Sequence, residues 1–166
     1  MDENSLAYSM DVLDEMAEAL HPIGMTVEKQ DPKETGDIPT GLIRPEGEGD
    51  WTITCNVVPT HKDNVSTTFV QLSIPITPPC PEQREELEKF ARLGNGQFLM
   101  GTLLMVGDVL LMKYVIVLEP TIAMEESHVQ AAVFAFCQQG ETLARRAGGI
   151  CRGKWTAAEA LTAEIG

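Results

Sequence analysis

Two apolar segments on either side of Gly107-Asp108 constrain the fold of this chain most strongly. Residues 97–106 and 109–118 are rich in branched and large apolar side chains. The two residues between them suit the tight turn of a β-hairpin, which requires positive φ angles. The sequence therefore predicts two antiparallel strands joined by a two-residue turn.

Both faces of this predicted hairpin are apolar. When one layer of helices covers an antiparallel sheet, the uncovered face is normally polar. Something must therefore cover the second face, and the candidates are the chain's own helices or tail, the mate in a dimer, or a bound client chain. One face carries Leu99, Leu103, Met105, Leu110, Met112 and Ile116, and the other carries Phe98, Met100, Leu104, Val106, Val109, Leu111, Val115 and Val117.

Three helices are predicted by apolar residues at helical spacing. The first ends at His21-Pro22, because proline disfavours helical geometry in the residue before it. A short helix occupies residues 82–93, and a long helix ends before Gly148-Gly149, where glycine is the usual stop signal. The apolar stripe of the first helix is Leu6, Met10, Leu13, Ala17 and Leu20.

Alternating apolar and polar residues predict strands over residues 51–57 and 65–76, with less marked segments at 23–29 and around Leu42-Ile43. We expect two to three of these segments to form strands before the short helix and two strands after it, which with three gives the order α-β-β-β-α-β-β-α. Strands that follow one another between helices, without βα alternation, predict an α+β fold: an antiparallel sheet with helices packed on it.

Residues 1–148 are expected to form a single α+β domain, and residues 149–166 a C-terminal tail. Within the tail, Thr156 and Glu159 have the spacing of a capping box and predict the start of a short helix. So short a helix is marginal by itself, and it must dock on something. We expect it to dock on the apolar hairpin, of the same chain or of a dimer mate, as a removable cover. The residues that would dock are Trp155, Leu161 and Ile165.

The net charge of −13 argues against nucleic acid as a partner, because most of the surface would repel a phosphate backbone. The chain begins with acidic residues and no apolar stretch follows, which argues against a secretory signal, and no segment is apolar for long enough to span a bilayer. These features predict a cytoplasmic protein that binds no membrane. No C-x-x-C pair occurs, so four free thiols are expected: Cys55, Cys80, Cys137 and Cys151.

No catalytic, cofactor-binding or metal-binding constellation stands out. His21, His61 and His128 have no partner at metal-ligand spacing. Cys137 follows His128 by nine residues on one predicted helix, too far along its axis for a direct dyad. The leading expectation is a protein that is not an enzyme and needs no cofactor. The alternative is a small enzyme whose site is assembled from distant residues, for example Glu119, His128 and Cys137.

One family shares this order of elements: an opening helix, the strands 51–57 and 65–76, a short helix ending in Phe90-Ala91-Arg92-Leu93, a hairpin and a long helix. Over roughly residues 4–147 the chain resembles the type III secretion chaperone-like fold, especially the YbjN-like group of bacterial proteins. Gly94-Asn95-Gly96 loosely matches an Asn-containing stretch of the YbjN-like pattern. The resemblance implies a dimerising, non-enzymatic binding protein, because secretion chaperones hold a partly unfolded effector segment and YbjN-like proteins are regarded as regulators.

We therefore expect a homodimer that binds a protein or peptide segment. An apolar edge on the long helix, formed by Phe134 with Cys137, adds to the apolar area of the hairpin and favours the dimer. The residues expected to contact the partner are Leu99, Leu103, Met105, Leu110, Met112, Ile116, Phe134 and Trp155.

Overall fold

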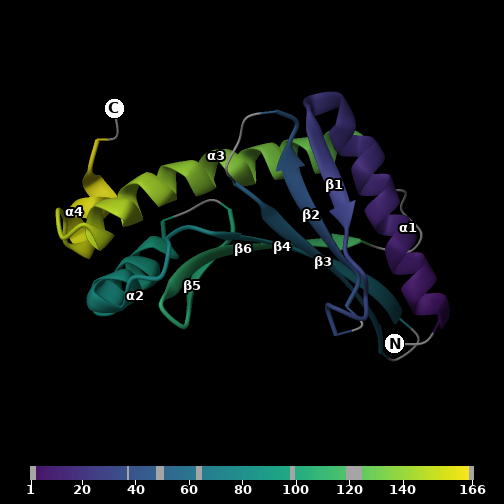
Figure 1. Ribbon diagram of the computed structural model, residues 1–166, viewed down its shortest axis with the longest axis horizontal. Helices are drawn as coiled ribbons and strands as arrows, with labels where there is room; N and C mark the ends of the chain where they lie inside the picture. Colours follow the sequence, from purple (N-terminus) through teal and green to yellow (C-terminus); the bar gives the residue numbers. More distant parts are fainter. Residues whose placement is uncertain are drawn as a thin grey trace. The chain divides into compact units, whose positions relative to one another are not determined.

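The computed structural model describes residues 3–36, 38–47, 51–62, 65–97, 100–118 and 125–164. It confirms the predicted α+β class, because six strands form one antiparallel sheet and helices pack on it (Figure 1). The chain divides into two compact units. The first consists of Met1–Leu72 with Val115–Val133, and the second of Ser73–Tyr114 with Phe134–Gly166.

The first unit begins with an amphipathic helix packed against three strands. Its elements are α1 (Glu3–Leu20), η1 (His21–Ile23), β1 (Met25–Lys29), β2 (Thr40–Pro45), β3 (Ile53–Lys62) and most of β4 (Val65–Pro75). As predicted, α1 ends just before His21-Pro22. A single 3-10 turn follows, and Gly24 reverses the chain into β1 with a φ of 74°. α1 lies against β1 and β3.

The buried face of α1 differs from the predicted stripe. Leu13 and Leu20 are buried as predicted, but Leu6, Met10 and Ala17 are only half-buried. Ser9 takes a core position because its hydroxyl donates to the Ser5 carbonyl oxygen at 2.8 Å, so a polar residue is satisfied there. The buried face consists of Ser9, Val12, Leu13, Met16, Ala19 and Leu20.

Both less marked strand segments form strands, so four strands precede the second helix instead of three. β1 pairs antiparallel with β2, and Val27 lies opposite Ile43. β2 in turn pairs with β3, where Ile43 lies opposite Ile53. Gly41 on β2 lets α1 approach closely, because a Cβ there would lie 2.9 Å from Val27 Cγ1 and 3.1 Å from Leu13 Cδ2.

The second unit contains the hairpin and the C-terminal helices. Its elements are η2 (Pro81–Gln83), α2 (Arg84–Gly94), β5 (Thr102–Val106), most of β6 (Val109–Leu118), most of α3 (Glu126–Cys151) and α4 (Ala157–Thr162). The strand order of the sheet is β1-β2-β3-β4-β6-β5, which makes β5 an edge strand. The predicted hairpin is confirmed: Val106 lies opposite Val109, and Gly107 has a φ of 59°.

Two boundaries in the second unit differ from prediction. β5 begins at Thr102 and not at Gln97. α3 continues through Gly148-Gly149 to Cys151, because Ala147 and Ile150 are fully buried and hold the last turns in place. The expected boundary at residue 148 therefore falls inside a helix.

Candidate functional site

The β5–β6 hairpin has an inner face that the chain itself buries. In its register Leu103 lies opposite Met112 and Met105 opposite Leu110. Leu103, Leu110 and Met112 are 3%, 0% and 0% exposed. Strand side chains alternate between faces, so these residues define the inner side of the hairpin.

Helices α2 and α3 cover this inner face. Gly140 on α3 faces the sheet, and a Cβ there would lie 3.6 Å from both Ile74 Cγ2 and Met112 Cε. The Gln139 side-chain amide donates to the Met100 carbonyl oxygen and lies 3.6 Å from Met112 Sδ. Helix α2 contacts β5, the other strand of the hairpin. The inner face is therefore part of the core of the second unit.

Asn95, which follows α2, fixes the edge of β5. Its side-chain amide donates to the Leu103 carbonyl oxygen at 2.9 Å and accepts from the Leu103 N–H at 2.6 Å. These two bonds occupy the groups through which Leu103 would pair with another strand. Beside them lies a groove of about 360 Å³ between α2 and β5, lined by residues that include Arg84, Arg92 and Met105.

Most residues predicted to bind a partner lie on this covered side. Leu103, Leu110 and Met112 are core residues, and Met105 and Ile116 are half-buried. Leu99 lies outside the described residues. Phe134 on α3 is 53% exposed, whereas Trp155 is half-buried against α3. The sequence could not distinguish the two faces, because both are apolar and only the packing of the helices decides which one is covered.

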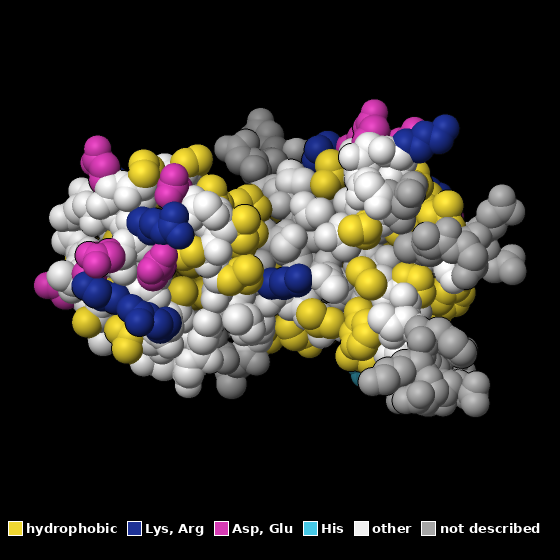
Figure 2. Space-filling model, turned by 90° about the horizontal axis from the view of Figure 1, so that it is seen from below, with side chains coloured by type: hydrophobic (Ala, Val, Ile, Leu, Met, Phe, Trp, Pro, Cys, Tyr) yellow, Lys and Arg dark blue, Asp and Glu magenta, His cyan; other side chains and the backbone are white. Residues whose placement is uncertain are grey.

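The surface that remains accessible is the opposite side, here called the outer hairpin face and defined as Thr102, Leu104, Val106, Val109, Leu111 and Lys113. Val106 is 53% exposed, and Leu104, Val109 and Leu111 are half-buried. No carboxylate belongs to this set, and within the described part of the chain Lys113 forms no ion pair. Figure 2 shows hydrophobic side chains reaching the molecular surface in several groups. In the first unit, Val115 and Val117 of β6 are also exposed, at 41% and 57%.

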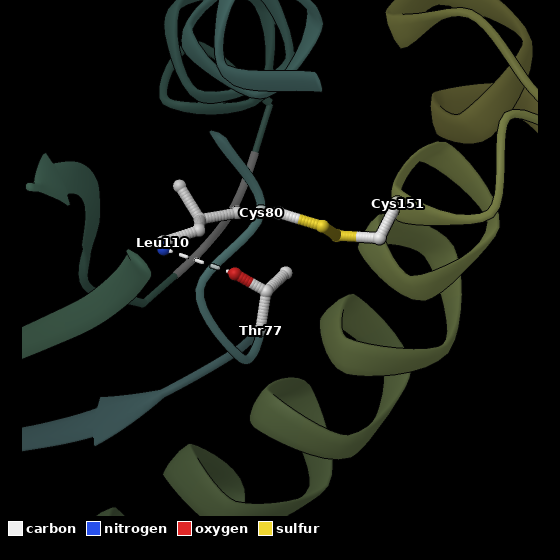
Figure 3. The surroundings of a disulfide bond; sticks show 4 residues. All are labelled: Thr77, Cys80, Leu110 and Cys151. Atoms are coloured by element: carbon white, nitrogen blue, oxygen red, sulfur yellow. Dashed lines mark hydrogen bonds between the residues drawn. A yellow bond between two sulfur atoms is a disulfide. The ribbon is translucent and has the colours of Figure 1, made fainter. Parts of the chain in front are cut away.

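A disulfide bond joins Cys80 to Cys151, which corrects the expectation of four free thiols (Figure 3). The two Cα atoms are 6.0 Å apart, a usual separation for a disulfide. Sequence spacing could not reveal the pair, because 71 residues separate them and neither belongs to a motif. Cys55 and Cys137 are free and buried, and burial raises the pKa of Cys55 to about 12 and that of Cys137 to about 11.

The short helix predicted in the tail exists as α4, and its capping box is present: the Thr156 hydroxyl accepts from the Glu159 N–H, and Glu159 accepts from the Thr156 N–H at 2.7 Å. α4 does not cover the hairpin, however, since it packs on α2. Its Ala157 N–H donates to Glu86 Oε2 at 2.8 Å.

Two carboxylates, those of Glu86 and Glu159, accept hydrogen bonds from the chain at the start of α4. A hydrogen bond from Lys89 and the one from Ala157 lower the pKa of Glu86. The backbone and hydroxyl of Thr156 likewise lower the pKa of Glu159. A groove of about 460 Å³ lies between α2 and α4, lined by residues that include Lys89, Arg92, Leu93 and Ala158.

The residues of the alternative enzyme site offer no assembled chemistry in the described ranges. His128 is 81% exposed, with Nδ1 3.1 Å from Glu125 Oε2. Cys137 is buried, and Glu119 lies outside the described residues. Across the parts of the chain that the structure covers, no three His, Cys, Asp or Glu residues gather in a metal-binding group. None of the described helices is long and apolar enough to cross a membrane.

Comparison of the chain with protein-family models, curated proteins and solved structures found no match.

Proposed function

We propose that the chain is a non-enzymatic module that binds a protein or peptide segment on its outer hairpin face. The observation that carries this proposal is a set of four apolar side chains on one hairpin face that the chain leaves exposed or half-buried, with Asp108 at the turn and Glu88 beside Leu104 at the rim. Apolar side chains at the centre of a contact surface supply most of its binding energy, and polar side chains at the rim add specificity. Val106, which is 53% exposed at the turn end of this face, would be a main contact.

Lys113 should make this surface prefer a bound segment that carries a negative charge. Its ammonium group has no acidic partner among the described residues, so a carboxylate in the bound segment would meet an available cation. We therefore propose a foreign segment that carries a carboxylate as the occupant of this face, and place the second copy on another surface.

The proposed homodimer uses a different surface, the outside of α3 around Phe134. This phenylalanine is 53% exposed, with half-buried Ala135 beside it and exposed Gln138 one turn further on. An exposed aromatic side chain on a long helix is suited to an isologous helix–helix contact. Light scattering should then give twice the 18.1 kDa chain mass, and Phe134→Glu should give a monomer with an unchanged melting temperature. A wild-type monomer at tens of micromolar would refute the dimer.

The element order supports a type III secretion chaperone-like assignment and, more finely, a YbjN-like one. An opening helix, an antiparallel sheet and a long late helix are the shared features. Within that assignment the protein acts in the cytoplasm, either holding a partly unfolded segment or regulating a partner. Fold likeness alone carries little information on function, so the binding surface must be tested directly.

The decisive test is binding of a permanently unfolded, carboxymethylated model client labelled with a fluorophore. Val106→Glu should weaken the binding seen by anisotropy at least tenfold, because a carboxylate replaces an exposed apolar contact. Ile38→Glu is the matched control, since Ile38 is 42% exposed in the first unit. Equal affinities of the two variants at equal melting temperatures would overturn the proposed site, and so would a wild-type protein that binds no client.

A further inference from the structure

The disulfide lies at a position where solvent can reach both sulfur-bearing residues. Cys80 and Cys151 are half-buried, whereas the free Cys55 and Cys137 are buried. A small thiol in solution therefore approaches the bonded pair more readily than the other two side chains. Figure 3 shows the bond joining the segment before η2 to the last turn of α3.

The bond lies next to the contact that attaches α4 to α2. Glu86 follows Cys80 by six residues, and Ala157 follows Cys151 by six residues. These two residues form the hydrogen bond between the helices. The disulfide therefore holds the end of α3, from which the chain leads into α4, close to the segment that leads into α2.

Among the described residues, one hydrogen bond and the packing of mainly small side chains join α4 to α2. The helix has six residues, which is too short to persist alone in water. Its buried residues on α2 are Ala157 and Ala160, whose small side chains supply little apolar area. Trp155 packs against Gly149 of α3, which keeps the preceding chain close but does not itself hold α4 to α2. The covalent link therefore adds a constraint to a contact that has little apolar area of its own.

Thiol–disulfide exchange would open the bond. A small thiolate attacks one of the two bonded sulfurs, forms a mixed disulfide with it and releases the other cysteine as a thiolate.

We propose that Cys80–Cys151 is a reversible redox staple whose reduction releases α4 from α2. A second small thiol attacks the mixed disulfide, so that two small thiols become one small disulfide and the protein gains two thiols. A small disulfide such as oxidised glutathione drives the reverse reaction. The groove between α2 and α4 exists only while the two helices are joined, so the oxidised protein carries it and the reduced protein does not. This inference is independent of the proposed binding function.

Hydrogen exchange measured on the full chain tests the staple. The amides of Ala157 and Ala160, which donate to Glu86 and to the Thr156 carbonyl oxygen, should exchange at least tenfold faster after reduction with dithiothreitol. Cys80→Ser should show the same increase without a reductant. Amides of β3 in the first unit should keep their protection in both cases, which shows that the fold survives.

Redox titration in glutathione buffers supplies the second readout. Thiol alkylation followed by mass spectrometry should give one two-electron transition confined to Cys80 and Cys151, and the Ala157 exchange rate should follow it. Exchange rates equal within twofold in the two redox states would overturn the staple. The same conclusion would follow if glutathione could not re-form the bond, or if the whole chain unfolded on reduction.

Discussion

Gly148 and Gly149 are adjacent in α3 and should respond to alanine with opposite signs. Alanine favours a helix over glycine by up to about 1 kcal/mol. At Gly148 the new Cβ would lie 3.2 Å from Arg152 Nη1, the end of a flexible side chain that can move away. Gly148→Ala should therefore stabilise the protein by about 0.5–1 kcal/mol.

At Gly149 a Cβ would overlap the indole ring of Trp155, which packs directly on the helix. The ring cannot shift by a few tenths of an ångström to make room, so it must leave its site or push α3 away. Such overpacking costs about 1–3 kcal/mol, and losing the burial of the ring adds to this. The loss exceeds the gain in helix propensity, so Gly149→Ala should destabilise by about 1–3 kcal/mol.

Thermal unfolding followed by circular dichroism measures both variants under non-reducing conditions. For a chain of this size, each kcal/mol shifts the melting temperature by about 2–4 °C. Gly148→Ala should melt above the wild type and Gly149→Ala below it, with Trp155 fluorescence altered only in the second. A Gly149→Ala variant as stable as Gly148→Ala would refute the packing of Trp155 on α3.

Three further predictions test other parts of the structure. Leu110→Ala should destabilise by about 2–5 kcal/mol because Leu110 is fully buried, whereas Val106→Ala should stay within about 0.5 kcal/mol; equal losses in urea unfolding would contradict the assignment of inner and outer faces. Denatured under non-reducing conditions, the protein should show two titratable thiols, and in the native state at pH 8 neither should react quickly, because burial raises both thiol pKa values; four thiols would refute the disulfide. The pKa values of Glu86 and Glu159 are lowered in the folded state, so the stabilisation from these carboxylates is present above their usual pKa of 4.5 and is lost as the pH falls through the folded values. Exchange of the Ala157 amide should therefore accelerate in acid before the sheet unfolds, and Glu86→Gln should remove most of that pH dependence.

Local signals in the sequence were sufficient for the hairpin, its turn and the capping box of α4. A two-residue connection at Gly107-Asp108 and the spacing of Thr156 and Glu159 are each determined by neighbouring residues. The end of α1 at Leu20 was equally local, because Pro22 limits the residue before it.

The end of α3 and the strands β1 and β2 depend on tertiary packing, which local sequence patterns do not record. Gly148-Gly149 is a typical helix stop, yet α3 continues because Ala147 and Ile150 on either side of the two glycines are fully buried. Gly149 also provides the space in which Trp155, six residues further along, packs. β1 and β2 carry weak patterns as short strands near one edge of the sheet, and their pairing with each other and with β3 establishes them.

In the candidate site too, features that depend on tertiary packing could not be predicted from the sequence. Alternation placed Leu103, Leu110 and Met112 together on one face, which is correct, but it gave no reason to assign that face to the core. The Cys80–Cys151 bond depends on how α3 ends near the beginning of α2, which no local pattern records.

Methyl NMR during addition of the unfolded model client tests the central claim most directly. The account predicts that the methyl signals of Leu104, Val106, Val109 and Leu111 shift or broaden in proportion to bound client. Those of the buried Leu110 and of the exposed Ile38 should stay in place. A client that binds while the outer hairpin face keeps its free-state spectrum would contradict the account.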